Sequence, residues 1–323
     1  MEKIKEAPEK APKRKKVSFD FPWITAAIAM LVLVVALSLA SPMFLSTSNL
    51  MSILRQAAVY VIMGLGMSFV MMTGGVDLSQ GSLLALIGVI SAYIVQNVGS
   101  IPLAILASVV VGALIGSVNG SIIACLNIPP FIATLASMYL CRGLTLVITQ
   151  ASPIVLTNDA FKWIGTGSLL GLPVPVYIFL VAAAAGQFIL SYPATGRFIL
   201  AVGSNQEAAR LSGIKTRWNK CKAYILSGIM VSIAGVVYVS RLGAAQATAG
   251  QSYEMEAIAA AVLGGEGTVF GTVLGAIVVA IVRNAMVLLE ISTYYQQIVT
   301  GAVILIAVII DTQRKARAAK RVD

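Results

Sequence analysis

The sequence is poor in charge and contains no histidine. Only 11% of its 323 residues are charged, compared with about 25% in soluble domains, while 58% are apolar and the mean hydropathy is +0.91. The absence of histidine removes the usual general base and the commonest transition-metal ligand. We therefore expect neither catalytic residues nor a metal site, and a Ser-His-Asp hydrolase is excluded.

Cysteine and phosphate-binding motifs are also scarce. Cys125, Cys141 and Cys221 show no CxxC spacing, so we interpret them as packing residues within a membrane. The chain has no G-x-x-x-x-G-K-[ST] motif and therefore no recognisable ATPase site of its own. Transport of a solute against its gradient would then need an ion gradient or a separate ATPase.

Basic residues give the chain a net charge of +10, but most of them are confined to three segments. Of the 23 Lys and Arg, seven lie in residues 1–16, six in 197–222 and five in 314–321. Such clustering beside hydrophobic spans follows the positive-inside rule, whereas a nucleic-acid-binding protein would interleave basic and aromatic residues. We expect a lipid bilayer as the surrounding medium and no nucleic-acid partner.

The same pattern divides the chain into three parts. Residues 1–22 form a basic N-terminal tail, 23–311 a membrane domain and 312–323 a basic C-terminal tail. Both tails and the polar loop 192–222 should face the cytoplasm.

Long apolar runs predict an all-α, polytopic membrane protein. The run 24–40 is a first span, although a cleaved signal peptide is an alternative. Residues 41–56 are too polar to cross, and they suit a helix lying at the outer interface. The remaining spans are approximately 57–72, 82–95, 102–125, 131–149, 173–190, 223–241 and 298–310, with an interrupted stretch at 255–289.

Topology constrains the interrupted stretch. If the loop 192–222 and the C-terminal tail both face the cytoplasm, an even number of crossings must separate Ser252 from Tyr294. Two short crossings that break at Gly264–Gly267 satisfy this condition, and so does a re-entrant hairpin. The first arrangement gives ten crossings, which we favour, and the second gives eight.

The segment 73–82, TGGVDLSQGS, joins two apolar spans with little polar spacer. One interpretation is a tight turn made by Gly74 and Gly75, with Asp77 or Ser79 capping the next helix. The other is a broken helix whose polar groups line a pathway, because irregular backbone in membranes lies mainly beside cavities. Asp77 is the first candidate for a residue needed in transport, through structure or gating.

Other polar residues lie within the apolar runs. Asn119 lies on a small-residue face with Gly112, Gly116 and Gly120, which predicts close helix packing and interhelical hydrogen bonds. Glu254 and Glu256 begin a span, where they cap the positive helix end or help to close an outer gate. Arg142 and Arg283 are costly in a membrane, so each should snorkel or pair with an acid.

The loop 192–222 contains a predicted short helix. Ser204 or Asn205 can cap it, Glu207 suits its first turn and Gly213 can end it. It is either a surface helix that joins two spans or a docking helix for a cytoplasmic partner.

Several strings resemble a known family. Glu207-Ala208-Ala209 followed by Gly213 resembles the coupling loop of bacterial ABC importer permeases. The strings GSNQEAARLSGI, TGGVDLSQGSLLAL, PPFIATLASMYLCRGL, YEMEAIAAAVLGG and YYQQIVTGAVILIAVIID look like the monosaccharide permeases of the ribose, galactose and xylose class, nearest the ribose type. The glycine-rich turn at Gly264–Gly267 is about six residues shorter than this class usually has, which leaves its geometry open.

The resemblance implies a non-enzymatic transport subunit in a bacterial inner membrane. Its expected partners are a second permease copy, an extracytoplasmic sugar-binding protein and a cytoplasmic ABC ATPase that holds ATP and Mg²⁺. It implies ATPase coupling by Gly203, Asn205, Glu207, Ala208, Ala209, Arg210 and Gly213, and pathway or gating roles for Asp77, Ser79, Asn119, Glu254 and Glu256. The alternative is a secondary transporter coupled to protons or sodium through its few acids.

Overall fold

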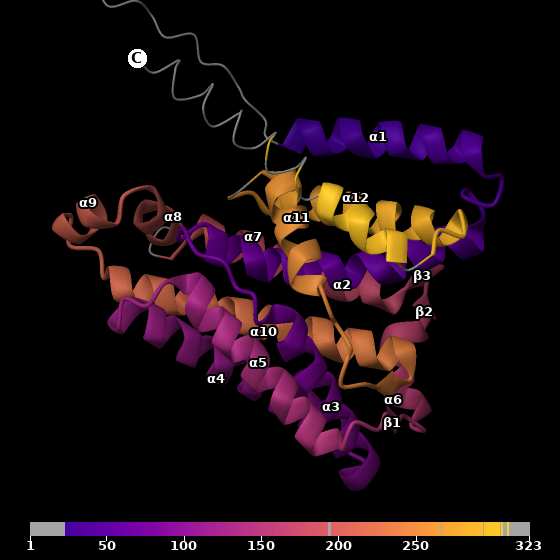
Figure 1. Cartoon of the computed structure of the whole chain (residues 1–323), viewed down its shortest axis with the longest axis horizontal. Helices are drawn as coiled ribbons and strands as arrows, with labels where there is room; N and C mark the ends of the chain where they lie inside the picture. Colours follow the sequence, from indigo (N-terminus) through magenta and orange to yellow (C-terminus); the bar gives the residue numbers. More distant parts are fainter. Residues whose placement is uncertain are drawn as a thin grey trace, which may run out of the picture.

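The protein is a bundle of long helices with short helices and strand pairs at its two ends (Figure 1). The computed structural model describes residues 23–192, 195–265, 267–292, 294–303, 305 and 309. Its helices are α1 (Trp23–Ala40), α2 (Thr47–Met71), α3 (Gln80–Val98), α4 (Ile101–Cys125), α5 (Pro130–Thr149), α6 (Asp159–Thr166), α7 (Val174–Ser191), α8 (Gly196–Ser204), α9 (Gln206–Leu211), α10 (Thr216–Leu242), α11 (Tyr253–Gly264) and α12 (Val269–Leu288). Residues 294–303 are also helical, and four two-residue strands lie in the described part of the chain: β1 (Ile154–Val155), β2 (Ser168–Leu169), β3 (Leu172–Pro173) and β4 (Ala244–Ala245).

The strands form two antiparallel pairs. β1 pairs with β4, with Ile154 opposite Ala245, and β2 pairs with β3, with Leu169 opposite Leu172. They lie with α6 at one end of the bundle, which we call the β1–β4 end. The opposite end, where α8 and α9 lie, is the α8–α9 end (Figure 1).

The all-α, polytopic class predicted from the sequence is confirmed. In the described part of the chain, eight helices are long and apolar enough to cross a membrane: α1, α2, α3, α4, α5, α7, α10 and α12. α2 and α10 are the most buried of these, and they pack against each other at the centre. α1 packs mainly on α12 and leaves most of its apolar surface exposed, as expected beside lipid.

One expectation is wrong. Residues 41–56 do not contain a separate interfacial helix, because α2 runs unbroken from Thr47 to Met71. Ser46 caps it by accepting a hydrogen bond from the Asn49 amide. The polar residues of its first turns find partners: Asn49 exchanges two hydrogen bonds with Asn284 of α12, and Gln56 donates to the Tyr60 hydroxyl. These contacts offset the cost of burying amides.

The interrupted stretch forms two helices joined by a short turn, and α12 with 20 residues is long enough to cross a membrane whereas α11 has 12 residues. The chain leaves β4 at one end, and α11 ends at a turn where a Cβ on Gly267 would lie 3.5 Å from Leu200 of α8. α12 returns: Phe270 near its start packs edge-on against Trp23, and Asn284 near its end meets Asn49. The shortened turn fits because Gly264 and Gly271 let α11 and α12 approach closely. The expected last span, 298–310, lies partly outside the described residues.

The small-residue face of α4 is confirmed as a packing surface. A Cβ on Gly112, Gly116 or Gly120 would lie 1.9 to 2.7 Å from the nearest atom of α10, so these glycines permit the backbones to touch. This close contact brings Asn119 of α4 into the core beside the broken segment between α2 and α3, where it is buried.

Candidate functional site

The segment between Met71 and Gln80 is a break in the helical path, as expected. Gly74 adopts a positive φ of 78°, which turns the chain, and the backbone stays non-helical until α3 begins. The break lies against α10, where the Tyr224 hydroxyl donates a hydrogen bond of 3.3 Å to the Val76 carbonyl oxygen. A side chain at position 75 would collide with that hydroxyl, so Gly75 is needed there.

Asp77 is the centre of a buried hydrogen-bond network. Its Oδ1 accepts from the amide and the hydroxyl of Ser79, at 3.1 and 2.5 Å, and its Oδ2 accepts from the Ser227 hydroxyl of α10 at 2.9 Å. Gln80 donates to the same Ser227 oxygen at 2.9 Å. Only 2% of Asp77 is exposed. The carboxylate therefore ties the broken segment to α10.

The network continues into two further helices. Asn119 of α4 donates to the Ser79 hydroxyl at 3.2 Å and accepts a hydrogen bond from Ser137 of α5. The predicted interhelical role of Asn119 is thus confirmed. Asp77, Ser79 and Asn119 together join four elements, and in this single chain they are enclosed by protein. Their role in transport stays a prediction, and their geometry favours a structural or gating one.

Glu254 and Glu256 both lie in the first turn of α11, after Ser252. Tyr253, immediately before Glu254, packs edge-on against Tyr60 of α2 and Tyr238 of α10, with ring centroids 5.2 and 5.5 Å apart. α11 therefore starts inside the bundle, where its positive end meets two carboxylates.

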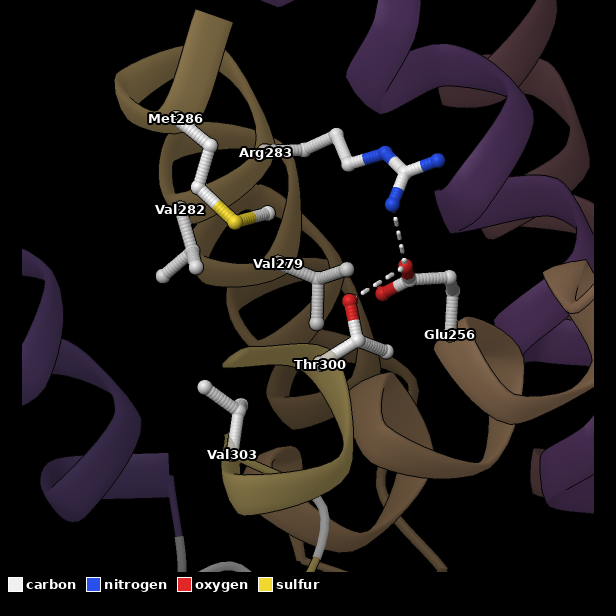
Figure 2. A pocket seen from close by; sticks show the side chains of 7 residues that line it. All are labelled: Glu256, Val279, Val282, Arg283, Met286, Thr300 and Val303. Carbon is white, nitrogen blue, oxygen red and sulfur yellow. Dashed lines mark hydrogen bonds and ion pairs between the residues drawn. The ribbon is translucent and has the colours of Figure 1, made fainter. Parts of the chain in front are cut away.

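The two predicted intramembrane arginines have partners. Arg283 of α12 lies 3.6 Å from Glu256, and Thr300 donates to the same carboxylate at 3.5 Å; Figure 2 shows the three side chains converging from three segments. They line a small crevice of about 10 Å³ with valines and Met286. Arg142 of α5 instead donates to the carbonyl oxygens of Ala247 and Ala249, at 2.9 Å for the latter. It anchors the loop between β4 and α11.

Two adjoining hollows open on the outside of the bundle beside this loop. One has a volume of about 450 Å³ and the other about 480 Å³, and Gln251 and Ser252 line both. Their polar lining combines Ser82, Tyr139, Arg142, Thr248, Gln251, Ser252, Glu254, Glu256, Arg283, Gln297 and Thr300. We call this pair the polar hollow. Polar residues within membrane helices usually face a cavity or another subunit, and this set offers many hydrogen-bonding groups.

The α8–α9 end carries the predicted docking helix. Asn205 caps α9 by accepting from the Ala208 amide at 2.9 Å, and Gly213 ends it with a φ of 81°. Glu207 and Arg210 form an exposed ion pair. The hydrogen bond from Arg210, and then its charge, lower the pKa of the Glu207 carboxyl. At neutral pH the exposed face of α9 therefore carries a negative charge on Glu207 and a positive charge on Arg210.

α9 is itself held in place by neighbouring helices. Ala209 is buried, while Ala208 is exposed beside the ion pair. Lys220 of α10 donates to Gln206 at 2.5 Å. Before α9 comes α8, a second short helix within the polar loop 192–222. Gly203 in α8 lies against Met72 at the start of the broken segment.

Sequence reasoning missed several residues of these sites. Ser227, Gln80 and Ser137 complete the Asp77 network, but they are isolated polar residues in apolar runs. Leu211, 76% exposed at the end of α9, offers an apolar contact that the string EAARL could have indicated. Tyr139 and Gln251 carry no local signal.

Comparisons with known proteins agree with this architecture. Residues 49–308 match the family described as branched-chain amino acid transport system / permease component. The ribose import permease protein RbsC of Escherichia coli (strain K12) is 43% identical over 89% of this chain and 93% of its own length. The protein of the same name from Bacillus subtilis (strain 168) is 40% identical over 94% and 97%.

A third relative is more distant. The D-allose transport system permease protein AlsC of Escherichia coli (strain K12) is 34% identical over 95% of this chain and 96% of its own length. No solved structure matches the chain. With the family model covering most of its helices, this chain belongs to the branched-chain amino acid transport system / permease component family.

Proposed function

We propose that this chain is the membrane-spanning subunit of an ATP-driven ABC importer for a monosaccharide of the ribose type. The similarity to ribose import permeases over 89% of the chain carries the proposal. Relatives named for allose and xylose transport support a pentose or hexose as the solute class. The chain itself would perform no covalent chemistry, and ATP with Mg²⁺ would be bound by a separate ATPase.

The α8–α9 end is the proposed ATPase contact. Its docking face consists of Glu207, Ala208, Arg210 and Leu211, all exposed. Six Lys and Arg lie within residues 197–222, and by the positive-inside rule this end would face the cytoplasm, as would both basic tails. The membrane would be the bacterial inner membrane. A sugar-binding protein would then deliver solute at the β1–β4 end.

The polar hollow is the proposed solute pathway, closed by a second copy of the chain. An open hollow lined by Arg142, Glu254 and Gln251 is costly against lipid, so a protein partner on that face is expected. A symmetric pair of copies would join two such hollows into one passage. Its hydroxyl, amide and charged groups could replace the water that a sugar loses on entry.

The contacts offer a route from the ATPase to the pathway. Movement of α9 would displace α8, whose Gly203 touches Met72, and so shift the broken segment that carries Asp77. That segment is bonded to α10 through Ser227, and the same helix contacts Tyr253 at the start of α11 through Tyr238. ATP binding and release would in this way rock the helices between inward-open and outward-open states.

The test is uptake of radiolabelled ribose by the purified chain, with its ATPase and binding protein, in sealed vesicles. We expect accumulation only when ATP is present on the α8–α9 side. Accumulation driven by a proton or sodium gradient in vesicles without ATPase would overturn the proposal. It would favour a secondary transporter, for which the enclosed and hydrogen-bonded Asp77 gives little support.

A further inference from the structure

A groove lies between the end of α7 and the start of α10, away from the polar hollow. It has a volume of about 580 Å³. Its lining divides into two parts along the helices. Phe188, Ile189, Ile225 and Leu226 form an apolar wall, and the remaining residues lie nearer the helix ends.

The second part of the lining is amphipathic. Tyr192 follows α7, Thr195 precedes α8, and Trp218 and Lys222 lie in the first two turns of α10. The Lys222 ammonium lies 5.5 Å from the centre of the Trp218 ring, a cation–π contact. Tyr192 and Trp218 are 56% and 53% exposed. Aromatic rings with a polar edge favour the level of lipid headgroups.

Lys222 is half-buried and lacks a carboxylate partner in the described part of the chain. The ion pairs there use Lys162, Arg210 and Arg283. The one acid within residues 192–222 is Glu207, which is already paired with Arg210. Five further basic residues lie in that same range. The groove therefore presents an uncompensated positive charge at one end and an apolar wall at the other.

From this arrangement we infer that the groove binds an anionic phospholipid. The headgroup lies at the end formed by Lys222, Trp218 and Tyr192, and an acyl chain lies along Phe188 and Leu226. Basic pockets between membrane helices near the cytoplasmic surface bind anionic headgroups by the same combination of charge and apolar contact. A sugar would find hydrogen-bonding groups at one end alone, so the lining does not suit it. The inference is independent of which solute the chain transports.

The bound lipid would stabilise the α8–α9 end. Thr195 is the N-cap residue of α8, and α10 holds α9 through the contact between Lys220 and Gln206. A headgroup at Lys222 would thus lie beside the start of α8 and beside the contact that holds α9.

Fluorescence of Trp218 tests the inference. In a variant carrying Trp23→Phe and Trp163→Phe, Trp218 is the remaining tryptophan. This variant is reconstituted in phosphatidylcholine vesicles that contain a fixed fraction of either dibrominated phosphatidylglycerol or dibrominated phosphatidylcholine, since bromine quenches tryptophan on contact. We expect an association constant about fivefold higher for phosphatidylglycerol, the ratio that one lysine near an anionic headgroup contributes.

Two further substitutions separate charge from packing. Lys222→Gln should bring the ratio to about one while dibrominated phosphatidylcholine still quenches, which shows that the groove persists. Lys215→Gln, just before α10 and outside the groove lining, should leave the ratio unchanged. Equal quenching by both lipids in the starting variant, or an undiminished preference in Lys222→Gln, would overturn the inference. Absence of quenching by either lipid would overturn it too, because a protein surface would then cover the groove.

Discussion

Gly203 of α8 lies directly against the carbonyl group of Met72. A Cβ built on Gly203 would be 1.8 Å from the Met72 oxygen, so no larger residue fits without moving one backbone from the other. This contact joins the α8–α9 end to the broken segment between α2 and α3, whose conformation Asp77 maintains. Gly203, the first residue of the string GSNQEAARL, is therefore required by the close packing of α8 on Met72.

Gly203→Ala should lower the stability of the protein and the coupling of ATP hydrolysis to transport. At an exposed helix position, replacing glycine by alanine raises the free energy of unfolding by up to about 1 kcal/mol. A backbone collision of this kind lowers it by about 1–3 kcal/mol. We expect a lower melting temperature in detergent and less ribose taken up per ATP hydrolysed. Gly143→Ala is the matched control, because a Cβ there meets nothing within 4 Å. Unchanged stability and uptake in Gly203→Ala would contradict the contact.

Glu207→Lys should leave membrane insertion intact and abolish binding of the ATPase. It breaks the pair with Arg210 and places a positive charge in the first turn of α9, where the helix dipole disfavours it. Arg210 lowers the pKa of Glu207, so the pair is present at neutral pH and is lost only as the pH falls through that lowered value. Co-purification with the tagged ATPase at neutral pH measures the effect.

Asp159→Lys provides the control for this change. Asp159 forms a similar ion pair, 2.6 Å from Lys162, in the first turn of α6 at the opposite end of the bundle. If this variant lost the ATPase as completely as Glu207→Lys, the effect would not be local to α9.

Local features of the fold could be predicted from the sequence because they depend on neighbouring residues. Asn205 and Gly213 bound α9, Gly74 turns the chain before α3, and the shortened glycine turn separates α11 from α12. Each follows from capping, from φ preference or from the length of an apolar run. The small-residue face of α4 was predictable for the same reason, since its glycines repeat every four residues.

Features that depend on distant partners were not predictable. The first turns of α2 look too polar to join a span, but Asn49 finds its partner in Asn284, 235 residues away along the chain. Ser227 lies 150 residues from Asp77. Hydropathy and periodicity report on one helix at a time, so neither indicates which polar groups are paired after packing.

Asp77→Ala should destabilise the bundle by about 1–3 kcal/mol, because it leaves the Ser79 and Ser227 hydroxyls without their acceptor in a buried site. Ser227→Ala should cost a similar amount, since it removes both the donor to Asp77 and the acceptor of the Gln80 amide in the same buried site. The double variant should fall short of the sum, because the two side chains share a hydrogen bond. Thermal unfolding in detergent measures all three.

Ser52→Ala is the neutral reference for that series, since its hydroxyl is exposed and bonds within its own helix. Strict additivity of Asp77→Ala and Ser227→Ala would show that the buried bond contributes nothing.

Gln251→Cys should react with a charged, membrane-impermeant thiol reagent if the polar hollow is the solute pathway. The exposed Cys125 is first replaced by serine, while Cys141 and Cys221 are buried. Gln251 lines both parts of the hollow, so water and reagent should reach the new thiol in the assembled importer. Ribose delivered by its binding protein should slow the reaction, because the sugar would occupy the same space.

Leu140→Cys is the matched control on α5. Leu140 is 67% exposed but does not line the hollow, so its thiol should face lipid, where a charged reagent does not enter. Faster labelling of Gln251→Cys than of Leu140→Cys, with protection by sugar at Gln251 alone, is the expected outcome. Equal labelling at both positions, or protection at neither, would place the pathway elsewhere. The many polar groups around Arg142 and Glu254 would then need another partner, because unpaired polar groups are costly within a membrane.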